Sequence, residues 1–417
     1  MKSETTPFAS VPVFTGRASP VEGAPPLAEL VAAARGMVPY LAGRASQTER
    51  DRRVSEETIR TFRDAGFFRL MQPAAYGGYE YGFSAFIDVV SELGRGCTSS
   101  AWSCSLGIIH QWLIALFPKQ AQDDVWGADA EAIACGSYAP AMTAEAVDGG
   151  YLIHGKWLYA SNVDNSQWAA LGVHIPPAEP GGAPSGGFML CPRADWEIED
   201  NWHVAGQSGT GSKTIVIDKP TFIPAHRKLT FAQAASGKAP GASVHSNPMY
   251  RITFLSAVPV TLISPLLGTA QGAVDALVEL CDTRVTRGAV NGAGNRLSQF
   301  FPVQSRIAEA AASVDAARLL LYRDVAEIEE RVGRGEAIDI DMRIRNRRDH
   351  AFATRLAQSA VEAVFGCVGG NGLSLEQPIQ RMWRDSNAIA RHITLNWDAV
   401  SSMVGQHMLG LEPKGQY

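Results

Sequence analysis

Two histidines stand where a side chain could accept a proton from a bound molecule. His392 lies in the segment Arg391-His-Ile-Thr-Leu-Asn-Trp-Asp398, and His110 ends the apolar run Leu106-Gly-Ile-Ile-His110. Histidine changes its charge closest to neutral pH, so each could act as a general base toward a weakly acidic O–H or N–H group. A lone histidine in an apolar helix is more often a buried core residue, and this alternative stays open for both.

Arginine, glycine and tryptophan residues offer further binding chemistry. Arg251 could pair with a carboxylate on a substrate, although a structural salt bridge explains it equally well. The cluster Gly369-Gly-Asn-Gly372 could let the backbone approach a cofactor closely, or could simply turn the chain between helices. Trp112 belongs to a set of tryptophans that could stack on a planar aromatic molecule, although packing is the more common role of such residues.

The absence of several motifs argues against several classes of site and enzyme. The sequence has no HExxH, no CxxC pair and no EF-hand loop, so no metal site is predicted. It also lacks the GxSxG and GxxxxGK[ST] signatures of α/β-hydrolases and P-loop enzymes. Gly206-Gln-Ser-Gly-Thr-Gly-Ser212 looks suited to phosphate, but it opens no predicted helix, so a dinucleotide-binding unit is not expected there.

Composition indicates an ordinary globular protein of 417 residues. The 37 Lys and Arg against 42 Asp and Glu give a net charge of −5, so neither nucleic acid nor an anionic membrane is an expected partner. The longest apolar run, residues 254–267, is interrupted by two prolines and is shorter than the roughly 20 residues of a membrane span. Without a signal peptide or a cysteine framework, we expect a cytoplasmic protein with six buried thiols.

The elements that must position these residues fall into three predicted domains. Residues 1–130 are predicted to form an N-terminal helical domain, in which Ser55 caps a helix that Gly66 ends. Residues 131–240 contain a hairpin signal at Val147–Tyr151 and only short β-like runs, which predicts an antiparallel β-domain. The runs are 168–175, 187–191, 214–217 and 221–223. Residues 241–417 return to helical periodicity and are predicted to form a bundle.

Two apolar stripes at helical spacing predict core-facing helices in this last domain. The first stripe consists of Ile307, Val314, Leu321, Val325, Ile328 and Val332. The second consists of Phe352, Leu356, Ala360 and Val364. The predicted fold class is therefore mainly α with a central antiparallel β-domain.

A series of fragments along nearly the whole chain resembles the acyl-CoA dehydrogenases. They are Pro73-Ala-Ala-Tyr-Gly-Gly78, Gly155-Lys-Trp157, Arg284 with Gly288, Val303-Gln304 with Ile307-Ala308, Gly369-Gly-Asn-Gly372, and Pro378 with Arg381 and Arg384-Asp385. Each fragment is weak alone, and their order and spacing carry the resemblance. The resemblance implies an N-terminal helical domain, a β-barrel-like middle domain and a C-terminal four-helix bundle.

The sequence departs from that family at its catalytic base. Acyl-CoA dehydrogenases usually carry a Glu eight residues after the Asp of their "RD" pair, and this position is Ile393 here. No Glu lies between Glu376 and Glu412, and none lies between Glu199 and Glu279, where a branch of the family places its base. Because a thioester α-proton needs a positioned carboxylate, the dehydrogenase reaction is an alternative and not the expectation.

The segment around His392 resembles a different branch of the same fold. Arg384-Asp385 followed by His392 and Asn396-Trp-Asp398 resembles the oxygenase component of two-component 4-hydroxyphenylacetate 3-hydroxylase and related phenol and indole hydroxylases. The resemblance implies a flavin-dependent monooxygenase that takes FADH2 or FMNH2 from a separate flavin reductase. It also implies reaction with O2 through a C4a-hydroperoxyflavin, a small aromatic substrate of the phenol or indole type, and a homotetramer. N-oxygenation of an amine and a flavin-free scaffold are further alternatives.

The resemblance assigns cofactor roles to several residues. Trp157 marks the strand that faces the flavin, and Ser161 matches a serine that bonds flavin N5, although a turn serine satisfying its own backbone is the alternative. Arg284 matches an arginine that binds the flavin phosphate, with a helix-surface charge as the alternative. Gly369, Gly370 and Gly372 would approach the cofactor.

The resemblance also places substrate-facing residues. His392 would lie on the reaction side of the flavin as a base with a pKa near 7, and His110 would contact the substrate and take part in catalysis. Arg251 and Trp112 would contribute to the substrate site.

Overall fold

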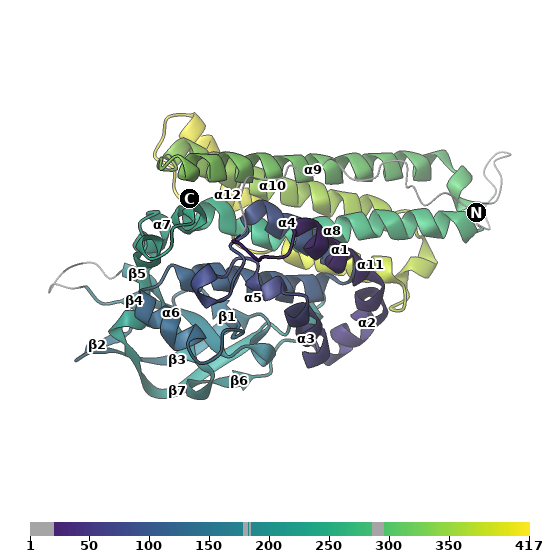
Figure 1. Ribbon diagram of the computed structural model, residues 1–417. Coiled ribbons are helices and arrows are strands. Elements are labelled where there is room, and N and C mark those ends of the chain that lie inside the picture. Colours follow the sequence, from purple (N-terminus) through teal and green to yellow (C-terminus); the bar gives the residue numbers. More distant parts are fainter. Residues whose placement is uncertain (1–20, 178–181, 183–184, 286–295) are drawn as a thin grey trace.

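A computed structural model describes the chain apart from residues 1–20, 178–181, 183–184 and 286–295. Long helices lie side by side in one layer, the strands lie on the opposite side of the molecule, and helices of the N-terminal part lie between and beside them (Figure 1). This arrangement confirms the predicted mainly helical class with a central β-domain. The strands lie between Ala134 and Thr230, and the domain limits at residues 130 and 240 stay predictions.

The N-terminal helices include the one that the sequence predicts after Ser55. They are α1 (Leu27–Gly36), α2 (Val38–Asp51), α3 (Glu56–Asp64), α4 (Phe83–Gly96), α5 (Thr98–Ala115) and α6 (Lys119–Trp126). Ser55 caps α3 by accepting a hydrogen bond from the Thr58 N–H at 3.2 Å, and Gly66 follows that helix with a φ of 76°. Helix α5, which carries His110, is buried along almost its whole length.

Two four-stranded sheets form the middle of the chain. One has the order β1 (Ala134–Ser137), β4 (Trp168–Ile175), β5 (Ser185–Pro192), β8 (Lys228–Thr230). The other has the order β2 (Glu145–Val147), β3 (Gly150–Ala160), β7 (Lys213–Pro224), β6 (Glu197–Glu199). The predicted hairpin is confirmed, since Val147 pairs with Gly150.

Two details of these sheets correct the prediction. Strand β1 pairs with β4 in parallel, and the β2–β3 hairpin of the other sheet lies between them in the sequence. The runs predicted at 214–217 and 221–223 belong to one strand, β7, which continues through an irregularity in its pairing with β3 near Gly155. A bulge absorbs extra residues without ending a strand, so the Pro220 region does not separate two strands.

The C-terminal helices include one with two prolines in its interior. They are α8 (Phe254–Thr283), α9 (Phe301–Gly333), α10 (Ile340–Phe365), α11 (Pro378–Ile389) and α12 (Trp397–Met408). Helix α8 runs through Pro259 and Pro265, the two prolines that interrupt the longest apolar run of the sequence. Among the described residues it is the one helix long and apolar enough to cross a membrane, and 83% of its most apolar stretch is buried inside the protein.

The apolar stripes lie mostly as predicted. In α9, all members of the first stripe from Val314 onward are buried, and Ile307 is partly buried against the core. In α10, Ala360 and Val364 are buried, but Phe352 is 40% exposed and corrects the prediction. Its ring lies 5.6 Å from that of Trp397 in α12, so a neighbouring helix and not the core receives it.

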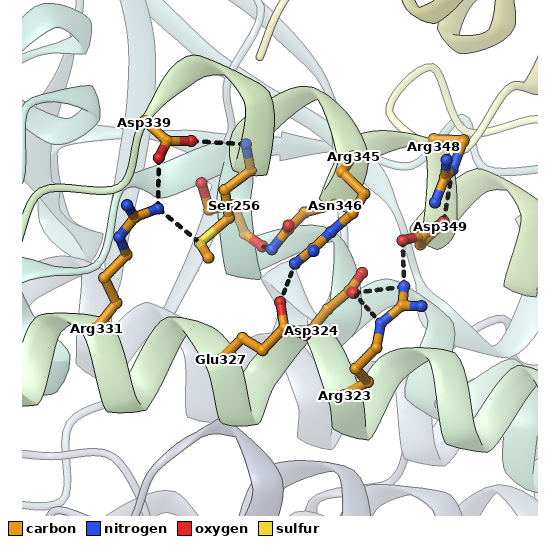
Figure 2. A network of polar contacts seen from close by, with 11 residues as sticks. Ser256, Arg323, Asp324, Glu327, Arg331, Asp339, Arg345, Asn346, Arg348 and Asp349 are labelled. Atoms are coloured by element: carbon orange, nitrogen blue, oxygen red, sulfur yellow. Dashed lines mark hydrogen bonds and ion pairs between the residues drawn. The ribbon is translucent and has the colours of Figure 1, made fainter.

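Polar contacts join α9 to α10 along their shared side. Figure 2 shows Arg323, Glu327 and Arg331 of α9 facing partners on α10 or at its start. These partners are Asp349, Arg345 and Asp339 in that order. Fixing α10 against α9 matters for the site, because α10 also carries the buried Arg347.

Candidate active site

One large cavity of about 1430 Å³ lies between α5, the two sheets, α8 and α11. Binding pockets for small molecules usually have volumes of about 300–1,000 Å³, so this cavity has room for a cofactor and a second ligand. Three of the predicted catalytic residues line it together, although they come from distant parts of the chain. These residues are His110, Ser161 and His392.

Three other predicted residues do not line the cavity. Trp157 is fully buried in the core of the middle domain, and its Nε1–H donates to the Gly172 carbonyl at 2.8 Å. Trp112 is also fully buried and stands behind the cavity wall, with its ring 6.3 Å from that of Phe254. Arg251 is exposed and ends a short 3-10 turn before α8.

The other predicted cofactor-binding residues, Arg284 and the three glycines, form a separate group. Arg284 follows the end of α8, and its Nη2 lies 3.7 Å from the position that a Cβ on Gly369 would take. Gly369 has a φ of 59°, and a Cβ on Gly372 would lie 2.1 Å from a Val368 methyl carbon. Both positions therefore require glycine, and neither they nor Gly370 lines the cavity. The motif residue Gly288 lies outside the described residues.

Ser161 belongs to a set of buried polar groups that we call the hydroxyl wall. It directly follows strand β3, and its Oγ accepts a hydrogen bond from the Trp102 Nε1–H at 3.0 Å. The Ser161 Oγ lies 2.6 Å from the Ser212 Oγ, which lies 2.6 Å from the Thr210 Oγ1. The Thr210 hydroxyl donates to the Gln207 carbonyl at 2.7 Å. These groups carry no ionisable side chain.

His392 stands on the opposite kind of surface, which we call the histidine wall. It lies between α11 and α12, with its Nδ1 2.7 Å from the Thr394 Oγ1 and accepting from the Thr394 N–H at 3.3 Å. Burial, and then the positive charge of Arg347, lower the pKa of His392 to about 4. Arg347 donates to the carbonyls of Thr394 at 2.7 Å and Gln416 at 3.2 Å, so it fixes the backbone of this wall.

Burial corrects the expected pKa of His392, and the contacts of its Nδ1 are compatible with two tautomers. A pKa of about 4 lies far below the value near 7 that its proposed role suggested, so the imidazole is neutral at pH 7. While Nδ1 accepts from the Thr394 N–H, the single imidazole proton lies on Nε2. The Thr394 hydroxyl could instead accept from a protonated Nδ1, which would free Nε2 to take a proton.

His110 forms a second neutral pair with a residue that the sequence did not single out. Burial lowers its pKa to about 4, and the Tyr138 oxygen lies 2.8 Å from its Nε2. Burial raises the pKa of Tyr138 far above its usual value, so the phenol keeps its proton. Tyr138 packs with Phe188 at 5.0 Å and Phe254 at 5.7 Å between ring centroids. The cavity therefore has an aromatic end with one polar pair.

Gln207 is another residue that sequence reasoning missed. It is 5% exposed, lines the cavity, and has a φ of 59°. Its backbone N–H donates to Oδ1 of the buried Asp385 at 2.6 Å, while both polar atoms of its side-chain amide lack a protein partner. In the sequence, the segment Gly206–Ser212 looks suited to phosphate. In the structure it supplies Thr210 and Ser212 of the hydroxyl wall and this unpaired amide.

The residues of the cavity fit a flavin. A flavin ring offers hydrogen-bond donors and acceptors along one edge and apolar faces above and below. The unpaired amide of Gln207 and the Ser161 oxygen can meet such an edge, while Trp102, Trp202 and Trp383 supply flat apolar surface.

Comparison with known proteins supports the same interpretation of the fold and the cavity. Residues 29–129 match the family described as acyl-CoA dehydrogenase, N-terminal domain, and residues 260–397 match acyl-CoA dehydrogenase, C-terminal domain. The chain is 44% identical over 398 residues to the oxygenase component of an FADH(2)-dependent resorcinol hydroxylase from Rhizobium sp. (strain MTP-10005). This alignment covers 94% of this chain and 97% of that protein.

Solved structures extend the similarity to three dimensions. The HsaA monooxygenase from M. tuberculosis is 34% identical, with a TM-score of 0.86 and coverage of 94% of this chain and 99% of that one. XiaF from Streptomyces sp., solved with FADH2 and glycerol, is 28% identical, with a TM-score of 0.84 over 94% and 97% of the two chains. The resemblance inferred from the sequence is confirmed. The chain therefore belongs to the acyl-CoA dehydrogenase family, in the branch that contains these flavin-dependent oxygenase components.

Proposed function

We propose that this chain is the oxygenase component of a two-component flavin-dependent monooxygenase that hydroxylates a small aromatic molecule. The observation that carries the proposal is the chemistry of the cavity lining. Among the described lining residues there is no Asp or Glu, and the position where a dehydrogenase carries its base is Ile393, which is 71% exposed. An acyl-CoA dehydrogenase needs a carboxylate there, whereas oxygen transfer to an aromatic ring does not.

When bound, reduced flavin would supply two electrons that activate O2. The balanced reaction is aromatic substrate, O2 and reduced flavin giving hydroxylated product, water and oxidised flavin. The chain's own contribution is to bind the flavin at the hydroxyl wall, exclude water and orient the ring against the histidine wall. The relative named as FADH(2)-dependent, and the FADH2 bound to XiaF, favour FADH2 over FMNH2.

His392 is proposed to take the proton that the substrate hydroxyl or N–H loses. A phenol has a pKa of about 10, so moving its proton to an imidazole of pKa about 4 is uphill by about 6 units, or about 8 kcal/mol. Complete transfer before the oxygen arrives is therefore disfavoured. Transfer becomes favourable as the ring carbon is attacked, because the attacked ring makes its hydroxyl much more acidic.

The aromatic end of the cavity is proposed to receive the substrate ring. Phe188, Phe231 and Phe254 line it, with the His110–Tyr138 pair as its polar contact. Ring stacking and edge contacts suit a planar phenol or indole. The resorcinol hydroxylase among the relatives supports a small phenol as the first candidate.

The electron source provides the main test. Purified chain with NADH, FAD and a panel of phenols, indoles and amines should form no product. Addition of a generic flavin reductase should restore turnover and incorporate one atom of ¹⁸O from ¹⁸O2 into a phenol or indole. Rapid NADH oxidation by the isolated chain, or oxygenation of amines alone, would contradict the proposal.

Assembly and location complete the proposal. A homotetramer and a location in the cytoplasm stay predictions, and a separate reductase follows from the oxygenase component names of the relatives. Light scattering of the purified chain tests the assembly directly. A monomer would contradict this part of the proposal without affecting the reaction.

A further inference from the structure

The hydroxyl wall is a continuous chain of four hydrogen bonds whose protons can be assigned. It runs from the Trp102 indole through Ser161, Ser212 and Thr210 to the Gln207 carbonyl, at 3.0, 2.6, 2.6 and 2.7 Å. All five residues are at most 7% exposed. Solvent therefore supplies few alternative partners, and the groups must satisfy one another.

The two ends of the chain determine its direction. An indole N–H only donates, a carbonyl only accepts, and each hydroxyl has one proton. Thr210 must donate to the Gln207 carbonyl, because two oxygens at 2.7 Å without a proton between them would repel. Ser212 must then donate to Thr210, and Ser161 must donate to Ser212. This order satisfies all four contacts at once.

With the hydrogen bonds in this order, Ser161 can contact a ligand only as a hydrogen-bond acceptor. Its oxygen accepts from Trp102 and its proton goes to Ser212, so one acceptor lone pair is left and no donor is left. Ser161 lines the cavity and is 6% exposed, so this lone pair is available to a molecule bound there.

We propose that Ser212 is a positioning residue that keeps Ser161 a hydrogen-bond acceptor, and that the cavity thereby favours reduced over oxidised flavin. This inference rests on the proposed function, in which Ser161 meets flavin N5. Reduced flavin carries a proton on N5 and can donate to Ser161. Oxidised flavin presents only a lone pair at N5, which faces the lone pair of Ser161.

The preference for reduced flavin should depend on Ser212, which accepts the Ser161 proton. In Ser212→Ala that acceptor is lost, and the Ser161 hydroxyl can turn its proton toward the cavity. The ratio of the dissociation constants for oxidised and reduced FAD should then fall about 2- to 10-fold, the effect of one neutral hydrogen bond. Thr210→Val keeps the shape of threonine but removes the acceptor of Ser212, so it should lower the ratio in the same direction.

Matched variants retain the hydroxyls. Ser212→Thr and Thr210→Ser should keep the wild-type ratio, because each preserves its link in the chain. The experiment is an anaerobic equilibrium titration of each protein with FADH2 and with oxidised FAD, without substrate or O2. General damage to the wall weakens the affinities for FADH2 and for oxidised FAD together and leaves their ratio unchanged. A changed ratio therefore reports a changed direction of the hydrogen bonds in the wall.

The possible outcomes separate this inference from the proposed function. A lowered ratio in Ser212→Ala and Thr210→Val, with retention in the matched variants, supports the inference. A wild-type ratio near one, or a ratio that neither variant changes, overturns the inference while flavin binding still supports the proposed function. Failure of the wild-type chain to bind either form of FAD overturns both. If Ser212→Ala does not fold, Thr210→Val decides the question alone.

Discussion

The hydroxyl wall and the histidine wall face the same cavity but control protons by different physical means. Ser161, Ser212 and Thr210 are neutral at every ordinary pH, and short hydrogen bonds determine which atom carries each proton. His392 and Arg347 belong to the histidine wall, where burial and a nearby charge lower a pKa. Hydrogen-bond geometry is enough to place protons on neutral groups, whereas electrostatics decides whether an ionisable group carries one.

This difference suits two separate tasks. A wall with a fixed proton order can present one unchanging contact to a cofactor that changes redox state. A wall with a neutral histidine can take up a proton transiently and release it in the next step. Exchanging the two kinds of residue would make the flavin contact depend on pH and would leave the substrate proton without an acceptor.

The largest effect is expected from removing the imidazole. His392→Ala should slow oxygen transfer by about 10²- to 10⁴-fold, the usual contribution of one general base, while FADH2 affinity changes little. Rapid mixing of the FADH2 complex with O2 and substrate, with product quantified over one turnover, measures the rate. Unchanged product formation would reduce His392 to a packing residue.

A matched variant determines which role the imidazole plays. His392→Gln retains a donor near the position of Nε2 but has no basic nitrogen. If His392 acts as a base, Gln should be as slow as Ala in the same single-turnover measurement. Near-normal oxygenation by Gln would instead show that the Nε2–H donor, the tautomer set by the Thr394 N–H, is what matters.

The next largest effect is expected from removing Asp385, which holds the backbone of Gln207 at the hydroxyl wall. Asp385 is 3% exposed and accepts the Gln207 N–H at 2.6 Å, so Asp385→Ala leaves that buried N–H unpaired. An unpaired buried donor costs about 1–3 kcal/mol, a factor of about 5 to 150 in the folding equilibrium. Urea unfolding should show this loss. Asp385→Asn keeps an acceptor oxygen and should lose less, and equal losses in the two variants would contradict this account.

Removing a nearby charge should change the pH dependence of the histidine wall. Because His392 has a pKa of about 4, single-turnover rates of the wild type should show no break from it between pH 5.5 and 8. Arg347→Met removes the second cause of the lowered pKa, so the pKa should rise toward 6.5 and protonation should begin within that range. The rate at pH 5.5 should then fall by at most about tenfold, while the FADH2 affinity stays level. An unchanged pH profile would show that burial alone sets the pKa.

The sequence predicted the fold well because the fold rests on local signals. The Ser55 cap, the Val147–Gly150 hairpin and the α9 stripe all depend on residues close in the chain. The errors arose where tertiary packing overrides such signals. Strand β7 continues where two separate strands are predicted, and Phe352 of the predicted core stripe packs on Trp397 instead.

The site was predicted less completely, for a physical reason. His110, Ser161 and His392 were identified by residue type and resemblance, and the structure brings them to one cavity. Ser212 and Gln207 act through contacts across the chain, and serine or glutamine in a glycine-rich loop carries no signal of such a contact. A distance of 2.6 Å between two hydroxyls exists only in three dimensions.

The smallest effect is expected from removing the Ser161 hydroxyl, which is proposed to contact the flavin. Ser161→Ala removes one neutral hydrogen bond, worth about 0.5–1.5 kcal/mol, which corresponds to about two- to tenfold. The rate of H2O2 release without substrate should rise by that factor, while the oxygen-transfer step itself changes little. Mixing the FADH2 complex with O2 and following H2O2 over one turnover, without substrate, measures this rate. His392→Ala should show the opposite profile, with slow oxygen transfer and no comparable rise in the rate of H2O2 release when substrate is absent.

If Ser161→Ala leaves H2O2 release unchanged, the flavin must meet another group at this wall. The unpaired Gln207 amide is then the next candidate, because it is buried, lines the same cavity and has no protein partner.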